Sequence, residues 1–152
     1  MLRLVALVLI MAGTAQAAEV RREPFGETKA GVAVVRTVLR NDLGMTVAAI
    51  DFGATLTAIE APDRRGRFAN VVLNRPDIAV YETNQRRYGA VVGRYAGRIT
   101  DARFTLDGAV HALEAGRNNM TLHGGANGYD KRVWSSSAIS DRRSVGVPYR
   151  LL

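Results

Sequence analysis

The chain has 152 residues, of which 47% are hydrophobic and 23% charged, and this composition is typical of one folded domain rather than of a disordered chain. It contains no cysteine, which excludes disulfides, a thiol nucleophile and thiolate metal sites. Its two histidines, His111 and His123, are too few for a multi-histidine metal centre. The 21 basic and 14 acidic residues give a formal net charge of +7, and arginine carries nearly all of the positive charge.

The first 17 residues have the organisation of a cleavable signal peptide. Arg3 supplies a positive start, residues 4–12 are all apolar, and Ala15 and Ala17 occupy the −3 and −1 positions of a signal-peptidase site. Such a run is too short to span a hydrocarbon core, which takes about 20 residues in a helix. We therefore expect cleavage after Ala17, a mature domain over residues 18–152, no membrane association after cleavage, and a periplasmic or secreted location. An uncleaved buried helix is the alternative.

The mature chain has the two-residue period of β-strands. Residues 32–39 are rich in β-branched side chains and predict one strand. Over residues 48–58 the apolar side chains fall on every second position, which predicts another strand with one buried face. Turn signals at residues 41–44 and 62–66 bound these segments, and a short strand is expected at residues 71–73.

The second half of the chain contains a hairpin signal. Residues 104–106 and 109–113 flank Asp107-Gly108, a pair that suits a type I′ turn because both central residues have positive φ. His111 would then lie opposite Phe104 and pack against it. One helical turn is expected within residues 76–81, and no segment has sustained 3.6-residue apolar spacing. The pattern predicts an all-β fold, with a β-sandwich as its architecture.

Two segments carry more specific information, YGAVVGRYAGRI at residues 88–99 and TLHGGANGYDKRVW at residues 121–134. Together they resemble the aldose 1-epimerase (galactose mutarotase) family, whose members carry a "GR.ANRI" segment, a strand–"LDG"–strand hairpin and an "LHGG..GFDK..W" segment in this order. Matching segments upstream extend the resemblance over residues 25–134. The resemblance implies a large antiparallel β-sandwich that holds a sugar in an open cleft on one sheet.

The resemblance also implies a reaction and two site residues. Family members interconvert the α and β anomers of aldohexoses such as galactose or glucose by acid–base ring opening and reclosure, with no cofactor and no metal. By this resemblance, Arg98 binds sugar hydroxyls, and His123 is the first of two catalytic histidines and lies near the ring oxygen. A guanidinium presents fixed donors to neighbouring hydroxyls, and an imidazole can donate or accept a proton near neutral pH.

Several other residues have structural interpretations beside the functional ones. Gly124 and Gly125 either allow the backbone to approach a ligand or permit positive φ in a tight loop. Arg94 is interpreted as a solvated or structural arginine. Trp134 is either a stacking platform for a sugar or a residue of the core or sheet edge. Four arginine pairs lie scattered in turns without aromatic neighbours, which favours a solvated surface over a nucleic-acid site.

The sequence also departs from the family pattern. Gly97 stands where many members have an asparagine, so one hydrogen bond to the sugar is expected to be absent or supplied differently. The family's second histidine and its glutamate base lie in later segments that this sequence does not contain. The pattern is lost from about Ser140, and the hypothesis is a truncation or a wrong reading frame there. Strands without partners would then lead to poor solubility or association.

These departures leave alternatives to a mutarotase open. One is a non-catalytic carbohydrate-binding domain that retains Arg98 and His123, and another is a non-functional fragment. A hexose-phosphate epimerase would need a basic cluster in the cleft. The preferred sugar and the oligomeric state stay open.

Overall fold

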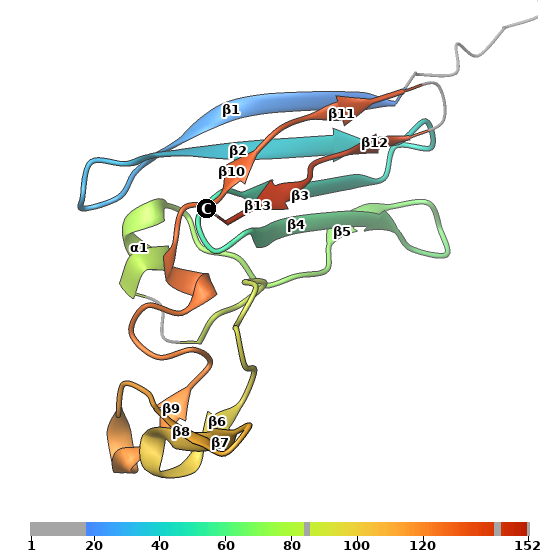
Figure 1. The fold of residues 1–152 in the computed structure, drawn as a ribbon. Helices are drawn as coiled ribbons and strands as arrows, with labels where there is room; N and C mark the ends of the chain where they lie inside the picture. The colour runs from blue at the N-terminus through green and yellow to red at the C-terminus, as the bar shows by residue number, and fades with distance from the viewer. Residues whose placement is uncertain (1–17, 84–85, 142–143, 152) are drawn as a thin grey trace, which may run out of the picture.

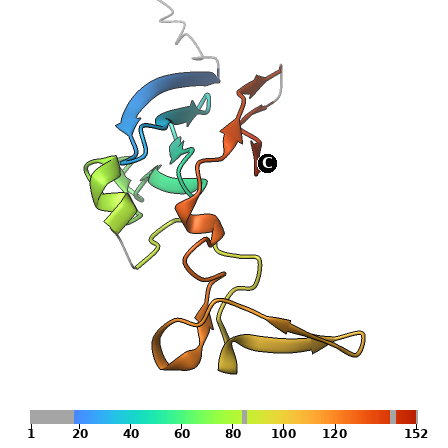
Figure 2. The ribbon, with the colours of Figure 1, turned by 60° about the vertical axis from the view of Figure 1, so that its left-hand side comes forward.

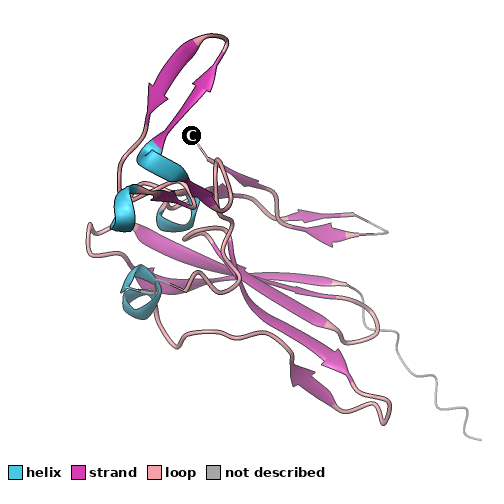
Figure 3. Cartoon of the chain, turned by 90° about the horizontal axis from the view of Figure 1, so that it is seen from below, coloured by secondary structure: helices cyan, strands magenta, loops and turns pink. Residues whose placement is uncertain are grey.

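The computed structural model describes residues 18–83, 86–141 and 144–151, and the expected signal peptide at residues 1–17 lies outside them. The strands are β1 (Glu19–Glu27), β2 (Ala33–Arg40), β3 (Thr46–Ile50), β4 (Thr55–Pro62), β5 (Phe68–Asn70), β6 (Arg98–Ile99), β7 (Arg103–Leu106), β8 (Ala109–Ala112), β9 (Thr121–Leu122), β10 (Ser135–Ser136), β11 (Ile139–Ser140), β12 (Val145–Gly146) and β13 (Tyr149–Arg150). The helix α1 spans Ile78–Thr83, and short 3₁₀ segments span Thr100–Ala102, Arg117–Asn119 and Tyr129–Lys131. Strands dominate, which confirms the predicted all-β class (Figure 3). No helix in the described part of the chain is both long and apolar enough to cross a bilayer.

The largest unit is an antiparallel sheet with the strand order β1-β2-β3-β4-β5 (Figure 1). Its core is a cluster of buried side chains from β2, the end of β3, the connection after β3, and α1, namely Val34, Ile50, Phe52, Ile78 and Tyr81. Phe25 packs against this cluster, with its ring centroid 6.0 Å from that of Tyr81. The β-branched segment predicted at residues 32–39 is β2, so this prediction is confirmed.

The last described residues form a second layer against this sheet. The pairs β10–β13 and β11–β12 are antiparallel, and β11 and β12 contact β1 and β2 (Figures 1 and 2). A β-bridge joins Phe52 to Val133, and the Ser136 hydroxyl donates a 2.6 Å hydrogen bond to Oδ1 of Asp51. Two facing layers of antiparallel strands agree with the predicted sandwich.

The single strand predicted over residues 48–58 is wrong. The segment contains the end of β3, a four-residue connection and the start of β4, and Ile50 pairs with Thr55 across this connection. The alternation continues through the connection, so periodicity alone could not find the turn. Thr55 and Thr57, which the alternation places on the polar face, are buried in the structure. The short strand predicted at residues 71–73 is also wrong, since β5 ends at Asn70.

Residues 86–131 form the part that lies below the sheet in Figure 1. The predicted hairpin is confirmed as β7 and β8, with positive φ at both Asp107 (51°) and Gly108 (77°). Phe104 faces His111 in the register, and their rings stack with centroids 5.1 Å apart. His111 therefore packs in the hairpin, as predicted.

The phenol of Tyr149, in β13, is expected to lose its proton at a higher pH than an ordinary tyrosine does. Burial raises the pKa of its phenol to about 12, and the nearby carboxylate of Asp51 acts in the same direction. A phenol in the unfolded chain ionises near pH 10, so between about pH 10 and 12 the native state binds more protons than the unfolded state. The stabilisation from the neutral phenol is therefore complete below about pH 10 and is lost as the pH rises through 12.

A spectrophotometric titration of the phenols checks this expectation. The phenol that ionises near pH 12 should disappear in Tyr149→Phe, which retains Tyr81, whose pKa burial also raises, and urea midpoints should fall less between about pH 9 and 11 in this variant than in the wild type. Persistence of the late phenol in Tyr149→Phe would contradict the assignment.

Candidate sugar site

The two residues predicted from the sequence lie on neighbouring strands below the sheet. β6 and β9 pair so that Arg98 faces Leu122 and Ile99 faces Thr121. His123 follows β9 directly and continues the pairing, because its backbone N–H donates to the carbonyl of Gly97 at 2.9 Å. The structure thus brings Arg98 and His123 to the same end of one short ladder.

The imidazole of His123 is held by the same glycine. The Gly97 N–H donates to Nδ1 of His123 at 3.0 Å, while Gly97 has a φ of +103° that suits a residue without a side chain. A nitrogen that accepts a hydrogen bond carries no proton, so this geometry assigns the proton of the neutral ring to Nε2. The backbone of Gly97 therefore orients the imidazole ring of His123.

The loop after His123 is packed tightly against another segment of backbone. Gly124 has a φ of +89°, and a Cβ at this position would lie 1.8 Å from the carbonyl oxygen of Gly93. Gly125 also has positive φ, at +79°. Both glycines have the positive φ of a tight loop, and Gly124 also lines a cavity beside Arg98, so both interpretations of this pair stay open.

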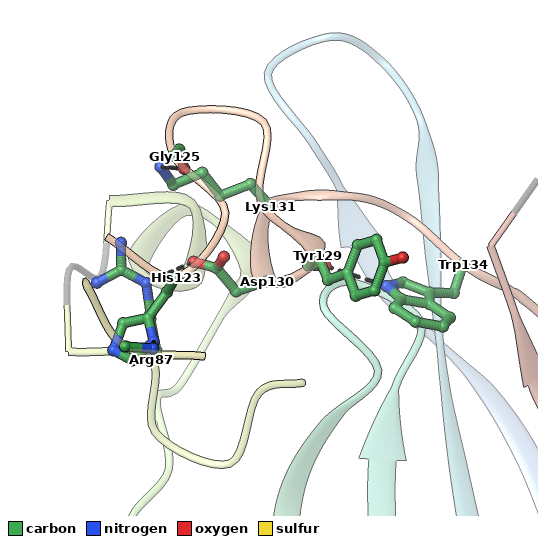
Figure 4. A network of polar contacts seen from close by, with 8 residues as sticks. Arg87, His123, Gly125, Tyr129, Asp130, Lys131 and Trp134 are labelled. Atoms are coloured by element: carbon green, nitrogen blue, oxygen red, sulfur yellow. Dashed lines mark hydrogen bonds and ion pairs between the residues drawn. The ribbon is translucent and has the colours of Figure 1, made fainter. Parts of the chain in front are cut away.

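A buried ion pair supports the same loop from the other side. Nε of Arg87 donates to Oδ2 of Asp130 at 2.9 Å, and the two side chains are only 16% and 4% exposed (Figure 4). Asp130 also lies close to the loop, since a Cβ on Gly128 would meet both Oδ1 of Asp130 and the carbonyl of His123. The interpretation of Arg87 as a solvated surface residue is wrong, because its side chain is largely buried and paired with Asp130.

A cavity of about 730 Å³ opens beside Arg98. Its walls combine three guanidinium groups with aromatic rings and one carboxylate, from Arg94, Arg98, Arg132, Tyr95, Phe104, Tyr129 and Glu114. Such a mixture of hydrogen-bonding groups and ring faces suits a polar ring-shaped ligand. Within the described residues, His123 is not among the side chains that line this cavity.

The structure shows what Arg94 and Trp134 contact, the two residues for which the sequence left more than one role open. Arg94 is exposed and lies over the ring of Tyr129, with its guanidinium carbon 5.8 Å from the ring centroid. Trp134 is half-buried, donates from Nε1 to the carbonyl of Tyr129 at 3.1 Å, and meets the ring of Tyr129 edge-on. Trp134 is therefore a packing residue, and the sequence analysis missed Tyr129 as one of the aromatic residues that line the cavity. Its place in the second motif was the signal that could have found it.

No group of three or more histidine, cysteine, aspartate or glutamate side chains within residues 18–83, 86–141 and 144–151 is arranged to hold a metal ion. The groups gathered at the cavity are donors suited to hydroxyl or anionic oxygen atoms.

Comparison with known proteins identifies relatives of this chain. The family model for aldose 1-epimerase matches residues 36–151, which includes the segment after Ser140. A galactose mutarotase of Rattus norvegicus is 41% identical over 123 residues, covering 80% of this chain and 36% of the relative. An aldose 1-epimerase of Escherichia coli is 37% identical over 105 residues, covering 69% of this chain and 30% of the relative.

Solved structures share the fold. A galactose 1-epimerase from Lactobacillus acidophilus superposes with a TM-score of 0.74 at 24% identity, over 88% of this chain and 38% of the other. An aldose epimerase homologue from C. elegans gives a TM-score of 0.60 at 32% identity, over 68% of this chain and 31% of the other. The chain thus spans about a third of the length of its relatives. From its sequence motifs, its fold and these matches, the chain belongs to the aldose 1-epimerase family.

Proposed function

We propose that this chain carries part of a mutarotase site that accelerates exchange between the α and β anomers of aldohexoses. The relatives named galactose mutarotase and aldose 1-epimerase support this activity. The observation that carries the proposal is the orientation of His123, whose Nδ1 accepts from Gly97 and whose proton is therefore on Nε2. Arg98, at the same end of the β6–β9 ladder, would bind the sugar hydroxyls.

In this proposal, His123 acts as a neutral hydrogen-bond donor. As the bond between C1 and the ring oxygen breaks, negative charge develops on the ring oxygen, and a donor aimed at this atom stabilises the transition state. Solvent water accepts the proton of the anomeric hydroxyl, and the ring oxygen takes a proton from Nε2 of His123, which solvent then reprotonates, so the open aldehyde forms with no net change of protons. Rotation about C1–C2 and reclosure give the other anomer.

Anomer exchange followed by polarimetry tests the proposal. Fresh α-galactose should reach equilibrium faster with the protein than in a protein-free blank, and His123→Ala should lower the protein-dependent rate about 100-fold, as expected for loss of one such donor. His111→Ala is the matched control, because this second histidine stacks in the exposed hairpin and should leave the rate unchanged. A wild-type rate equal to the blank would contradict the proposed activity.

A non-catalytic sugar-binding site is the second candidate. Two observations favour it. Arg98 lines the cavity of about 730 Å³, whereas His123 is not among the described residues that line this cavity. In this case calorimetry should detect saturable hexose binding that Arg98→Ala weakens, while anomer exchange stays at the rate of the blank. Flat titrations with galactose and glucose would exclude this candidate.

A further inference from the structure

We infer that Glu114 and Lys131 are positioning residues for the proposed reaction, because they hold the two sides of one peptide group directly after the turn that carries His123. This inference rests on the proposed function, since it concerns how the fold keeps the imidazole in place for that reaction. The peptide group joins Gly125 to Ala126, and we call it the anchored peptide. In this role neither charged side chain contacts the sugar.

His123 lies in a tight turn whose backbone conformation is unfavourable for a residue with a side chain. The N–H of Gly125 donates to the carbonyl of Leu122 at 3.0 Å, so His123 and Gly124 are the central residues of this turn. Both have positive φ, 53° at His123 and 89° at Gly124, which is the pattern of a type I′ turn. A histidine keeps such a φ only where surrounding contacts hold the chain in place. The turn therefore depends on what fixes the residues before and after it.

The anchored peptide fixes the chain after the turn, as the pairing of β6 with β9 fixes it before. Nζ of Lys131 donates to the carbonyl of Gly125 at 3.1 Å (Figure 4). The N–H of Ala126 donates to Oε2 of Glu114, also at 3.1 Å. This carbonyl and this N–H belong to the same peptide group, so a cation lies at the negative end of its dipole and a carboxylate at the positive end. Two charge-assisted hydrogen bonds thus fix its orientation, and a rotation of the peptide would break both.

Both charged side chains extend from backbone that is itself held in place. The buried hydroxyl of Thr121 donates to the carbonyl of Glu114 at 2.8 Å. The N–H of Lys131 donates to the carbonyl of Gly128 at 3.0 Å. A Cβ on Gly125 would lie 3.4 Å from Oε2 of Glu114, so this carboxylate lies directly against the loop. The two side chains therefore connect the anchored peptide to fixed parts of the fold.

The loss of either contact is expected to affect the reaction rate more than the stability of the fold. Glu114, Ala126 and Lys131 are all exposed, and charged contacts at exposed positions contribute little to the free energy of unfolding. Without one anchor, the turn would let the His123 backbone leave its positive φ, and the imidazole would move with it. A small displacement of a group that acts on the reacting atoms lowers the rate strongly.

Anomer exchange of α-galactose, measured over a range of sugar concentrations with variants of the full chain, tests the inference. Glu114→Ala and Lys131→Met should each lower the protein-dependent kcat about 10-fold or more with little change in KM, because a misplaced donor is lost in the transition state. Glu114→Gln keeps an acceptor oxygen for the N–H of Ala126 and should retain most of the rate. Glu60→Ala removes an exposed glutamate of β4 and is the matched control, which should leave both constants unchanged. The urea midpoints of all four variants should match that of the wild type.

The ring nitrogen signals of His123 in NMR spectra give a readout that does not depend on activity. Above the ordinary pKa of histidine, the wild type should show the signals of a ring whose Nδ1 is unprotonated, since this atom accepts from Gly97. In Glu114→Ala the signals should move towards the average of the two tautomers, whereas in Glu114→Gln they should stay in place.

Three outcomes would overturn the inference. Unchanged rates and unchanged ring signals in Glu114→Ala and Lys131→Met would do so and leave the proposed function standing. A higher KM at unchanged kcat would also do so, because the two side chains would then contact the sugar instead of holding His123 in place. A wild-type rate equal to that of the blank would overturn both the inference and the proposed function.

Discussion

Arg87→Met is expected to lower the free energy of unfolding by about 3–5 kcal/mol, the range found when one partner of a buried ion pair is removed. The Asp130 side chain is nearly inaccessible to solvent, and its Oδ2 accepts from the guanidinium. Its other oxygen, Oδ1, is buried without a hydrogen-bond partner among the described residues. Methionine keeps an unbranched apolar stem but leaves the carboxylate without a compensating charge. Urea unfolding, compared at equal m-values, measures the change.

The Arg67–Asp63 pair supplies a matched control for this prediction. Its Nε–Oδ2 distance is also 2.9 Å, but the two side chains are 72% and 38% exposed. Because water replaces a lost partner at an exposed site, Arg67→Met should leave the midpoint almost unchanged. Adding Asp130→Asn to Arg87→Met should restore part of the lost stability, since it removes the unpaired charge. Equal shifts for Arg87→Met and Arg67→Met would show that burial is not the source of the effect.

Gly124→Ala is expected to be the second strongly destabilising change, at about 2–4 kcal/mol. The positive φ contributes about 1 kcal/mol, and forcing a side chain into packed structure adds about 1–3 kcal/mol. The added Cβ would lie 1.8 Å from the carbonyl oxygen of Gly93, and neither backbone segment can yield without moving the loop that carries His123. Sugar binding and anomer exchange should therefore fall together with stability.

Gly66→Ala separates the two contributions to this effect. Gly66 has a similar φ of +76°, and nothing lies within 4 Å of the position that its Cβ would take. This variant should lose only the roughly 1 kcal/mol that positive φ accounts for. Thermal or urea unfolding measures both variants. If Gly124→Ala is no more destabilising than Gly66→Ala, the close approach to Gly93 does not contribute to the loss of unfolding free energy.

Local patterns in the sequence predicted some elements and missed others for clear reasons. The Asp107-Gly108 hairpin was predictable because the turn type depends on two adjacent residues. The boundary between β3 and β4 was not, because the apolar period of two continues through the connection between them. The strand β1 was likewise not predicted, because its residues are mostly exposed and carry no regular apolar alternation.

In the candidate site, too, the sequence predicted some features and the fold supplied others. Motifs singled out Arg98 and His123, and the structure places them at one end of the β6–β9 ladder. The donor that orients the imidazole is a backbone N–H of Gly97, which no side-chain pattern reveals. The sequence predicts that one hydrogen bond to the sugar is absent or supplied differently at Gly97, and the structure shows another contact of this residue, from its backbone N–H to Nδ1 of His123.

The sequence by itself determined the all-β class, the hairpin and the family, because strand period, turn residues and ordered motifs are all local properties of the chain. Only the tertiary structure decided which arginines are buried, which are partnered and which surround a cavity. Arg87 and Arg117 are similar side chains in polar surroundings of the sequence, yet Arg87 pairs with a carboxylate 43 positions away, whereas no ion pair within the described residues involves Arg117. Burial and charge balance depend on distances in the folded chain, and the order of residues does not contain these distances.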